Sequence, residues 1–261
     1  MRLISLLILV LTCSFSARAS EPVRIISVNE PPANFINKAG YPDGLVVDIV
    51  QALQNIVGNE STIEFIPEAR ALNIMDSQAN VLFFSISRTQ FREDKYHWVG
   101  KVFSKNWQVF TKVDSELHAS SLQDLANINA IGVVRGDVRE EWLVNRKFTN
   151  LYSVTQHDQN VQLLLWGRLP AIVYEQQGLT YSCEQLLIDC GQFKAIYTLH
   201  QSDVYLVMSK KTPQATLLKW QQAYQKLLSS GEIAAISQKW HQHLLNNLNI
   251  ISKKNGDFLT F

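Results

Sequence analysis

The sequence predicts an α/β fold with two lobes, each a mostly parallel β-sheet flanked by helices. Two observations support this fold class. Apolar segments typical of strands alternate with segments of helical periodicity over residues 23–86, and a similar alternation returns over residues 121–208. No Gly/Ser-rich linker or low-complexity tract divides the chain. We therefore expect two lobes built closely together, and not two domains on a flexible tether.

The first alternation opens with a β-rich segment that Pro31-Pro32 ends. Apolar residues then recur at helical spacing as far as Val57, and Gly58 is a suitable C-terminal stop for that helix. The segment 81–86 is continuously apolar, as buried parallel strands are. The expected strands are 23–28, 62–66 and 81–86, and the expected helices are 46–57 and 69–78.

The second alternation opens with a short helix, for which Ser121 and Asp124 have the spacing of a capping box. The further expected strands are 131–134, 151–155, 171–174, 195–199 and 204–208, and the further helices are 138–145, 158–166, 213–228 and 233–241. The tail 246–261 mixes apolar and polar residues without a clear period, a pattern that is compatible with disorder.

Residues 1–19 have the features of a secretory signal peptide. Arg2 supplies a positive start, residues 3–11 are almost wholly apolar, and Ala17-Arg18-Ala19 is a small-x-small cleavage pattern. The apolar run is too short for a membrane anchor. We therefore expect cleavage near Ala19 and a periplasmic protein. Cys13 follows a sequence that only faintly resembles a lipoprotein site, so lipidation there is disfavoured but left open.

Composition excludes several classes of protein. The whole chain has 24 Lys+Arg and 23 Asp+Glu, and Arg2 and Arg18 leave with the signal peptide, so the mature chain carries a net charge of −1. A chain without a basic excess has no electrostatic basis for binding nucleic acid. With 46% hydrophobic and 18% charged residues, it is neither disordered nor fibrous.

Two cysteines remain in the mature chain, Cys183 and Cys190. An even pair in an oxidising compartment indicates a disulfide that closes a short loop. Two free thiols are the alternative. A metal pair is disfavoured because no histidine or second cysteine pair is near in the sequence.

Over residues 23–241 the chain resembles family 3 of the bacterial extracellular solute-binding proteins. The most specific stretch runs from Ser85 to Glu93 and is similar to the family's Ser-x-Ser-x-Thr-x-x-Arg segment. Residues 44–49 resemble the family's helix start, and residues 131–136 its second-lobe strand and turn. Residues 231–240 are similar to its closing Gly-x-x-x-x-Ile-x-x-Lys-Trp pattern.

The resemblance implies the type II periplasmic binding protein fold. Lobe 1 would comprise residues 20–111 and 202–245, lobe 2 residues 112–201, with two extended crossings between them. It further implies a monomer, without a cofactor, that captures a small polar solute such as an amino acid or related carboxylate. The consumer would be the permease of an ABC importer, or alternatively a membrane sensor that receives the ligand.

The resemblance makes Arg92 the clamp for a substrate carboxylate. A guanidinium suits this role because its planar fork pairs with a carboxylate through two parallel hydrogen bonds. Ser85 and Ser87 flank the same turn, where their hydroxyl and backbone N–H groups would complete an anion cradle. The alternatives are a surface arginine beside Glu93 and ordinary loop serines.

Glu175 follows a predicted strand at its carboxyl end, where open α/β sheets bind ligands. By resemblance it would hold the α-amino group of the ligand, and an acid at a helix start is the equal alternative. Asp137 follows Gly136 where family members often carry Ser or Thr, and we favour helix capping for it.

Arg70 and Arg135 are further basic candidates near predicted element ends, and several arginines around a cleft would suit a dianion or a long ligand. Phe35, the one ring near the first loop, and Tyr174 are the candidate aromatic contacts for the ligand, although Tyr174 is equally compatible with core or hinge packing.

Catalytic motifs are not found: the chain has no Gly-x-Ser-x-Gly, no phosphate loop and no His-Glu-x-x-His. We therefore expect a binding protein and not an enzyme. The enzyme alternative is a small-acid dehydratase or lyase on the same fold, for which Glu175 is the only candidate acid or base.

Overall fold

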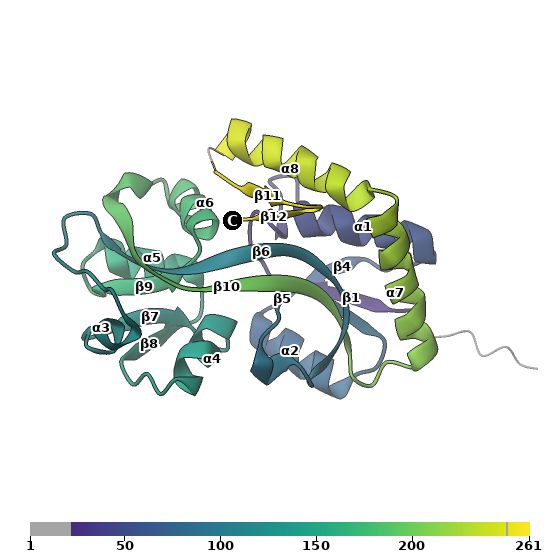
Figure 1. Ribbon diagram of the computed structural model, residues 1–261, viewed down its shortest axis with the longest axis horizontal. Coiled ribbons are helices and arrows are strands. Elements are labelled where there is room, and N and C mark those ends of the chain that lie inside the picture. The colour runs from purple at the N-terminus through teal and green to yellow at the C-terminus, as the bar shows by residue number, and fades with distance from the viewer. Residues whose placement is uncertain (1–21, 249) are drawn as a thin grey trace, which may run out of the picture.

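The computed structural model describes residues 22–248 and 250–261. The predicted signal peptide and Cys13 lie outside these residues, so cleavage and lipidation stay predictions. In the described part, helices and strands form two lobes joined by two long strands (Figure 1). The expected two-lobed α/β fold is confirmed.

Lobe 1 is built from both ends of the chain. Its strands are β1 (Arg24–Ser27), β4 (Ile63–Phe65), β5 (Val81–Ser87) and the small pair β2 (Phe35–Ile36) and β3 (Pro42–Asp43), and its helices are α1 (Leu45–Val57), α2 (Glu68–Ser77), η1 (Gln90–Arg92), α7 (Gln214–Ser229) and α8 (Glu232–Leu248). Strand β1 runs parallel to both neighbours, with Ile25 opposite Ile63 and Leu82. Helix α1 buries its apolar stripe and ends at Gly58, whose φ of 66° is left-handed, as the sequence predicts.

Lobe 2 is built from the middle of the chain. Its strands are β7 (Ile131–Val134), β8 (Leu151–Val154) and β9 (Ala171–Tyr174), and its helices are α3 (Leu122–Ala126), α4 (Val138–Asn145), α5 (His157–Leu165), α6 (Gln176–Leu186) and η2 (Cys190–Gln192). Strand β7 is parallel to β8 and to β9. The predicted capping box is present, because Ser121 accepts from the Asp124 N–H while the Asp124 carboxylate accepts from the Ser121 N–H.

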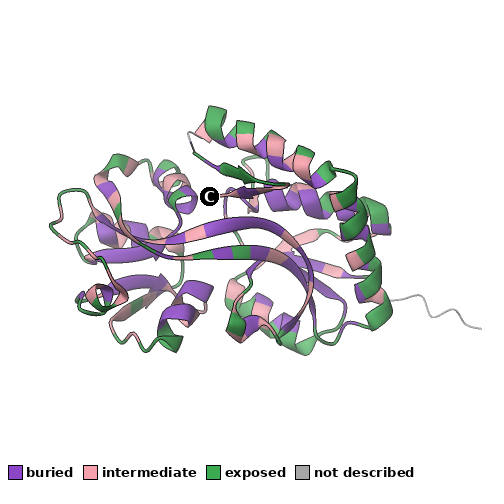
Figure 2. Ribbon diagram, in the orientation of Figure 1, coloured by how far each residue is buried: buried purple, intermediate pink, exposed green. Residues whose placement is uncertain are grey.

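Strands β6 (Tyr96–Lys112) and β10 (Phe193–Ser209) pair antiparallel along their length and run through both lobes (Figure 1). They join the lobes into one sheet with the order β4-β1-β5-β10-β6-β9-β7-β8. The expectation of separate strands at 195–199 and 204–208 was wrong, because Gln201 and Ser202 continue the pairing with Asn106 and Lys105. Figure 2 shows that this shared pair is mostly buried, whereas α1, α7 and α8 turn an exposed face outward.

The segment after α8 is ordered, which corrects the expectation for the tail. It forms a hairpin of β11 (Lys253–Asn255) and β12 (Phe258–Thr260), with Gly256 in the left-handed region at φ 62°. Strand β12 pairs in parallel with β6, where Thr260 lies opposite Ser104. The Phe261 ring packs edge-on against Phe103, with ring centroids 5.4 Å apart. The hairpin therefore extends the sheet at the strand that crosses between the lobes.

The predicted disulfide between Cys183 and Cys190 is present and ties the end of α6 to η2. Helix α6 itself was not identified from the sequence, because its residues are mostly polar and include Gly178. Of the helices in the described part of the chain, none combines the length and apolarity that crossing a membrane requires.

Candidate ligand-binding site between the lobes

A cavity of about 760 Å³ lies between the lobes. Lobe 1 lines it with the loop after β1, the start of α2, the end of β5 and Arg92. Lobe 2 lines it with the turns before α4 and α5, Tyr174 and one face of α6, and Lys105 of β6 lies between the two. The carboxyl ends of the parallel strands therefore face this cavity from both lobes, where α/β sheets place ligands.

Arg92 lines the cavity and is only 2% exposed. Its Nε donates to Oε2 of Glu141 at 2.9 Å, and its Nη2 lies 2.8 Å from the same oxygen. Glu68 is more distant, with Oε1 3.9 Å from Nη2. Because Glu141 belongs to α4 of lobe 2, the guanidinium holds a carboxylate across the gap between the lobes.

Ser85 and Ser87 are both buried at the end of β5 and line the cavity. The Ser85 hydroxyl donates to the side-chain oxygen of Asn34, so it is already engaged in lobe 1. The Ser87 hydroxyl belongs to a residue that is 1% exposed and has no hydrogen-bond partner among the described residues. An unpartnered buried hydroxyl is costly unless something else meets it, so Ser87 is the stronger ligand-binding candidate of the two.

Glu175 is buried at the N-terminus of α6, but its side chain does not cap that helix. It contacts the Arg139 guanidinium and lies 3.3 Å from Nζ of Lys105. Burial opposes ionisation, but Arg139 and Lys105 together outweigh it, so the pKa of Glu175 lies below its usual value. This acid is therefore a carboxylate held by two internal cations.

Asp137 has the capping role that the sequence favours. It precedes α4, and its Oδ1 accepts from the Arg139 backbone N–H at 2.7 Å. The same carboxylate accepts from Nε of Arg139, also at 2.7 Å. Burial works against its charge, but this guanidinium dominates and keeps the pKa of Asp137 low.

Arg139 and Lys105, two buried cations that line the cavity, were not among the site residues predicted from the sequence. Lys105 pairs with Glu30 on one side and Glu175 on the other. Burial disfavours its charge, but these two carboxylates keep the pKa of Lys105 above its ordinary value. The only signals in the sequence were a lysine within the segment 96–112, which is of mixed polarity, and an arginine two residues after a capping aspartate.

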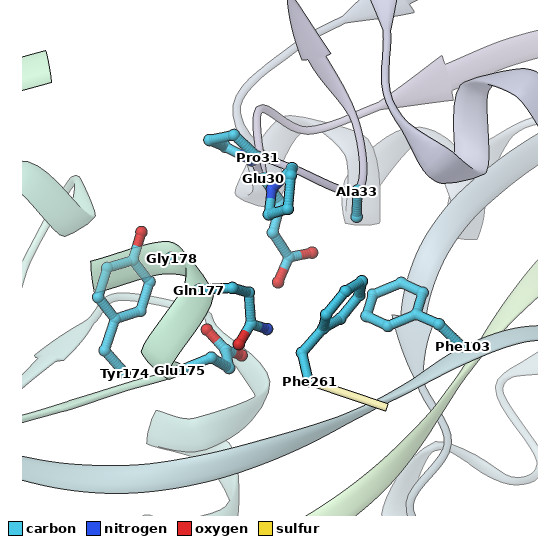
Figure 3. A pocket seen from close by; sticks show the side chains of 10 residues that line it. Glu30, Pro31, Ala33, Phe103, Tyr174, Glu175, Gln177, Gly178 and Phe261 are labelled. Carbon is cyan, nitrogen blue, oxygen red and sulfur yellow. The ribbon is translucent and has the colours of Figure 1, made fainter. Parts of the chain in front are cut away.

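Glu30 and Glu175 also line a small second cavity of about 10 Å³. Figure 3 shows the Glu30 side chain pointing from lobe 1 toward Gln177 and Glu175 of lobe 2, beside the ring of Phe261. A chain of alternating charges, Glu30, Lys105, Glu175, Arg139 and Asp137, thus runs from lobe 1 into lobe 2.

Tyr174 lines the cavity and stacks on His157, with ring centroids 4.2 Å apart and planes within 8°. Burial, with a further contribution from Arg139, lowers the pKa of His157 to about 4. The imidazole is therefore neutral at neutral pH, and its Nε2 can accept from Nη2 of Arg139 at 3.1 Å.

Of the remaining predicted site residues, Arg135 lines the cavity, whereas Phe35 and Arg70 do not. Phe35 is not among the residues that line the cavity, but its ring contacts Tyr181 of lobe 2 with centroids 5.9 Å apart. Arg135 is exposed and lines the cavity, with no ion pair to any described residue. Arg70 is exposed on α2 and does not line the cavity. Within residues 22–248 and 250–261, no group of His, Cys, Asp and Glu is arranged to hold a metal ion.

Comparison with known proteins identifies a matching family and several similar structures. The model of the bacterial extracellular solute-binding proteins, family 3, matches residues 23–243. A histidine kinase sensor domain with similarity to periplasmic binding proteins superposes with a TM-score of 0.73 and 18% identity, covering 84% of this chain and 96% of that one. None of the curated protein sequences matches the chain.

Two binding proteins for arginine or for basic amino acids are also similar to this chain in structure. An ancestral arginine-binding protein bound to arginine has a TM-score of 0.69 and 18% identity, covering 83% of this chain and 97% of that one. The arginine-, lysine-, histidine-binding protein ArtJ from Geobacillus stearothermophilus has a TM-score of 0.70 and 16% identity, covering 87% and 99%. At these identities the likeness establishes the fold.

Proposed function

The chain belongs to family 3 of the bacterial extracellular solute-binding proteins, and on that basis we propose that it captures a small polar solute in the cavity between its lobes for an ABC-type importer. The observation that supports this most is the cavity of about 760 Å³, which both lobes line with charged and polar side chains. Periplasmic binding proteins work by hinged lobes that close around a ligand.

Within this cavity, Arg92, Ser87 and Arg135 are the proposed contacts for acceptor groups of the ligand. Arg92 already binds a carboxylate, that of Glu141, so a ligand carboxylate would have to replace it. Ser87 offers an unpartnered hydroxyl, and Arg135 an unpaired guanidinium, among the described residues. The proposed compartment is the periplasm, which the signal peptide pattern and the disulfide both favour.

The enzyme alternative loses its candidate residue in this arrangement. A general acid must release a proton, and a general base must be free to take one. Glu175 is held as a carboxylate by Arg139 and Lys105 and does not line the main cavity. Binding without chemical change therefore fits these residues better than a dehydratase or lyase reaction.

A sensor role is the second candidate for the consumer of the ligand. The observation that favours it is the similarity to a histidine kinase sensor domain, at a TM-score of 0.73. Uptake of the labelled ligand by cells with and without the protein separates the two consumers. Loss of uptake supports the importer, whereas unchanged uptake with a lost transcriptional response to the ligand supports the sensor.

The binding proposal is tested with the mature protein from residue 20. A thermal-shift screen of amino acids, polyamines, small peptides and organic acids is followed by calorimetry of each hit. We expect one class to bind with a stoichiometry of one and to be recovered unchanged by mass spectrometry after a long incubation. A converted product would make the protein an enzyme, and no binding in any class would contradict the proposal.

A further inference from the structure

The hairpin β11–β12 is an addition to the part of the chain that the family model matches, because that match ends at residue 243. Its second strand, β12, pairs with β6 where β6 passes from lobe 1 to lobe 2. The Phe261 N–H donates to the Ser104 carbonyl at 3.1 Å, and the Phe261 carbonyl accepts from the Asn106 N–H at 2.9 Å. Nδ2 of Asn106 donates to the same oxygen, also at 2.9 Å. These hydrogen bonds hold the end of β12 on the crossing strand.

Strand β12 shares its edge of β6 with a strand of lobe 2. Strand β10 occupies one edge of β6 along its length, so β12 and β9 lie on the other. Strand β12 is parallel to β6 and reaches Asn106, whereas β9 is antiparallel and reaches Gln108. The carboxyl ends of β12 and β9 therefore face each other at Trp107. Because a change of the backbone at Ser104 or Asn106 would break hydrogen bonds to Phe261, β12 restrains bending of β6 on the lobe 1 side of this junction.

The Phe261 side chain fills the space between the lobes beside the hinge. On the lobe 1 side its ring packs against Phe103 and belongs to the buried core. On the other side it lines the cavity of about 10 Å³ together with Glu175, Gln177 and Gly178 at the start of α6 (Figure 3). A cavity of this size holds about one water molecule, so the ring leaves little free space against α6.

Separation of the lobes would affect the two sides of this ring differently. The hydrogen bonds to β6 and the contact with Phe103 keep Phe261 with lobe 1, whereas α6 moves with lobe 2. The ring would then lose its lobe 2 neighbours and expose apolar surface to water, which is unfavourable. The contact of Phe261 with α6 therefore favours the arrangement in which the lobes are close together.

We propose that the hairpin β11–β12 controls the opening of the molecule: β12 restrains the crossing strand β6, and Phe261 stabilises the closed arrangement through its contact with α6. This role goes beyond solute capture, because it concerns the equilibrium between open and closed arrangements without a solute. A solute that needs the closed form binds more weakly when that form is less populated. The hairpin thereby also raises the affinity for any solute that the closed cavity holds.

Pulsed electron resonance tests the inference by measuring the distance between two spin labels in the mature protein from residue 20, without added solute. The labels are attached through Asp76→Cys on α2 and Val144→Cys on α4, two exposed positions on helices that line the cavity from opposite lobes. The disulfide keeps Cys183 and Cys190 unreactive toward the label.

Three variants are compared with the labelled parent. Phe261→Ala removes the ring, and Asn106→Ala removes one hydrogen bond to β12 but leaves the ring in place. The control Ile250→Ala removes buried apolar atoms from the same lobe 1 core but lies outside β12. Urea unfolding of each protein accompanies the distance measurement, so that loss of stability is separated from opening.

We expect the parent to show mainly the shorter of two label distances. Phe261→Ala should raise the ratio of the long-distance to the short-distance population by about threefold or more, as the loss of a few tens of Å² of buried apolar surface would. Asn106→Ala should raise this ratio less, and Ile250→Ala should leave it unchanged although it lowers stability. A parent with only the long distance, or a ratio that Phe261→Ala changes no more than Ile250→Ala does, would overturn the proposal. If Phe261→Ala does not fold, Phe261→Leu takes its place in the same comparison.

Discussion

At the residue scale, the pairing of His157 with Arg139 shows how the cavity holds an imidazole neutral. The ring lies flat on Tyr174 and its Nε2 faces a guanidinium that Asp137 and Glu175 already bind. Protonation would put a second positive charge against Arg139 in a buried site. Burial is the largest cause of the lowered pKa of His157, followed by the charge of Arg139, and Lys105 also lowers it. Asp137 and Glu175 act in the opposite direction.

This environment predicts a pH dependence of stability. The pKa of His157 is about 4 when folded, against about 6.5 for an exposed histidine, so the unfolded chain binds the proton first. His157 thus contributes fully above pH 6.5, and the contribution falls as the pH drops through 4. The loss amounts to at most about 3 kcal/mol of unfolding free energy.

Urea unfolding of the parent and of His157→Gln at several pH values between 7 and 4 measures it. The difference in stability between the two proteins should shrink or reverse toward pH 4, because glutamine does not titrate. A constant difference over this range would contradict the buried neutral imidazole. His118→Gln, at an exposed histidine of lobe 2, is the control.

Residue identities in the site were partly predictable from the sequence. Asp137 was expected to cap a helix, and it does so, because capping depends only on neighbouring residues. Arg139 and Lys105 were not singled out, because their role depends on α4 and β6 meeting α6, which are distant in the sequence. Which carboxylate would satisfy Arg92 could not be read from local pattern, because Glu141 reaches it from the other lobe.

At the element scale, helices and strands with a strong local period matched the expectation closely. Helix α1 has its apolar stripe and its glycine stop where the sequence places them. Strand β10 was recognised only in pieces, and β6 only as an extended crossing between the lobes, because their polar central residues pair with each other and not with an apolar core. The hairpin β11–β12 escaped detection because each strand has only three residues.

The hairpin β11–β12 is expected to contribute to the stability of the fold. Leu259 of β12 is fully buried in the core of lobe 1, at 0% exposure, whereas nearby Ile251 is 79% exposed. Leu259→Ala should reduce the free energy of unfolding by about 2–5 kcal/mol, because it removes buried methyl groups and leaves a cavity.

Ile251→Ala is the matched control and should change the unfolding free energy by less than about 0.5 kcal/mol, as surface substitutions do. Chemical denaturation of the three proteins decides the matter. If the two substitutions have equal, small effects, the hairpin does not belong to the folded core.

At the scale of the whole molecule, two side-chain contacts close the cavity across the lobes. Arg92 of lobe 1 pairs with Glu141 of lobe 2, and the ring of Phe35 meets that of Tyr181. The partly buried Phe91, next to Arg92, packs against the core of lobe 2. The alternating charges from Glu30 to Asp137 lie at the base between them. These contacts belong to the chain itself, so they favour closure before any solute contributes.

Breaking the Arg92–Glu141 pair should therefore shift the molecule toward an open arrangement. Glu141→Gln leaves the nearly inaccessible Arg92 guanidinium with only Glu68 at 3.9 Å, and separation of the lobes lets water solvate it. Removing one partner of a buried pair typically costs about 3–5 kcal/mol, which exceeds the small free energy that separates alternative conformers.

Small-angle X-ray scattering of the protein without added solute measures this shift as a larger radius of gyration for Glu141→Gln than for the parent. The control Glu116→Gln removes an exposed acid of lobe 2 and should leave the profile unchanged. Arg92→Ala should also open the molecule, but less, because Glu141 is partly exposed and is solvated more easily than the arginine. An unchanged radius for both Arg92→Ala and Glu141→Gln would mean that the hinge strands and the aromatic contact hold the lobes together without this ion pair.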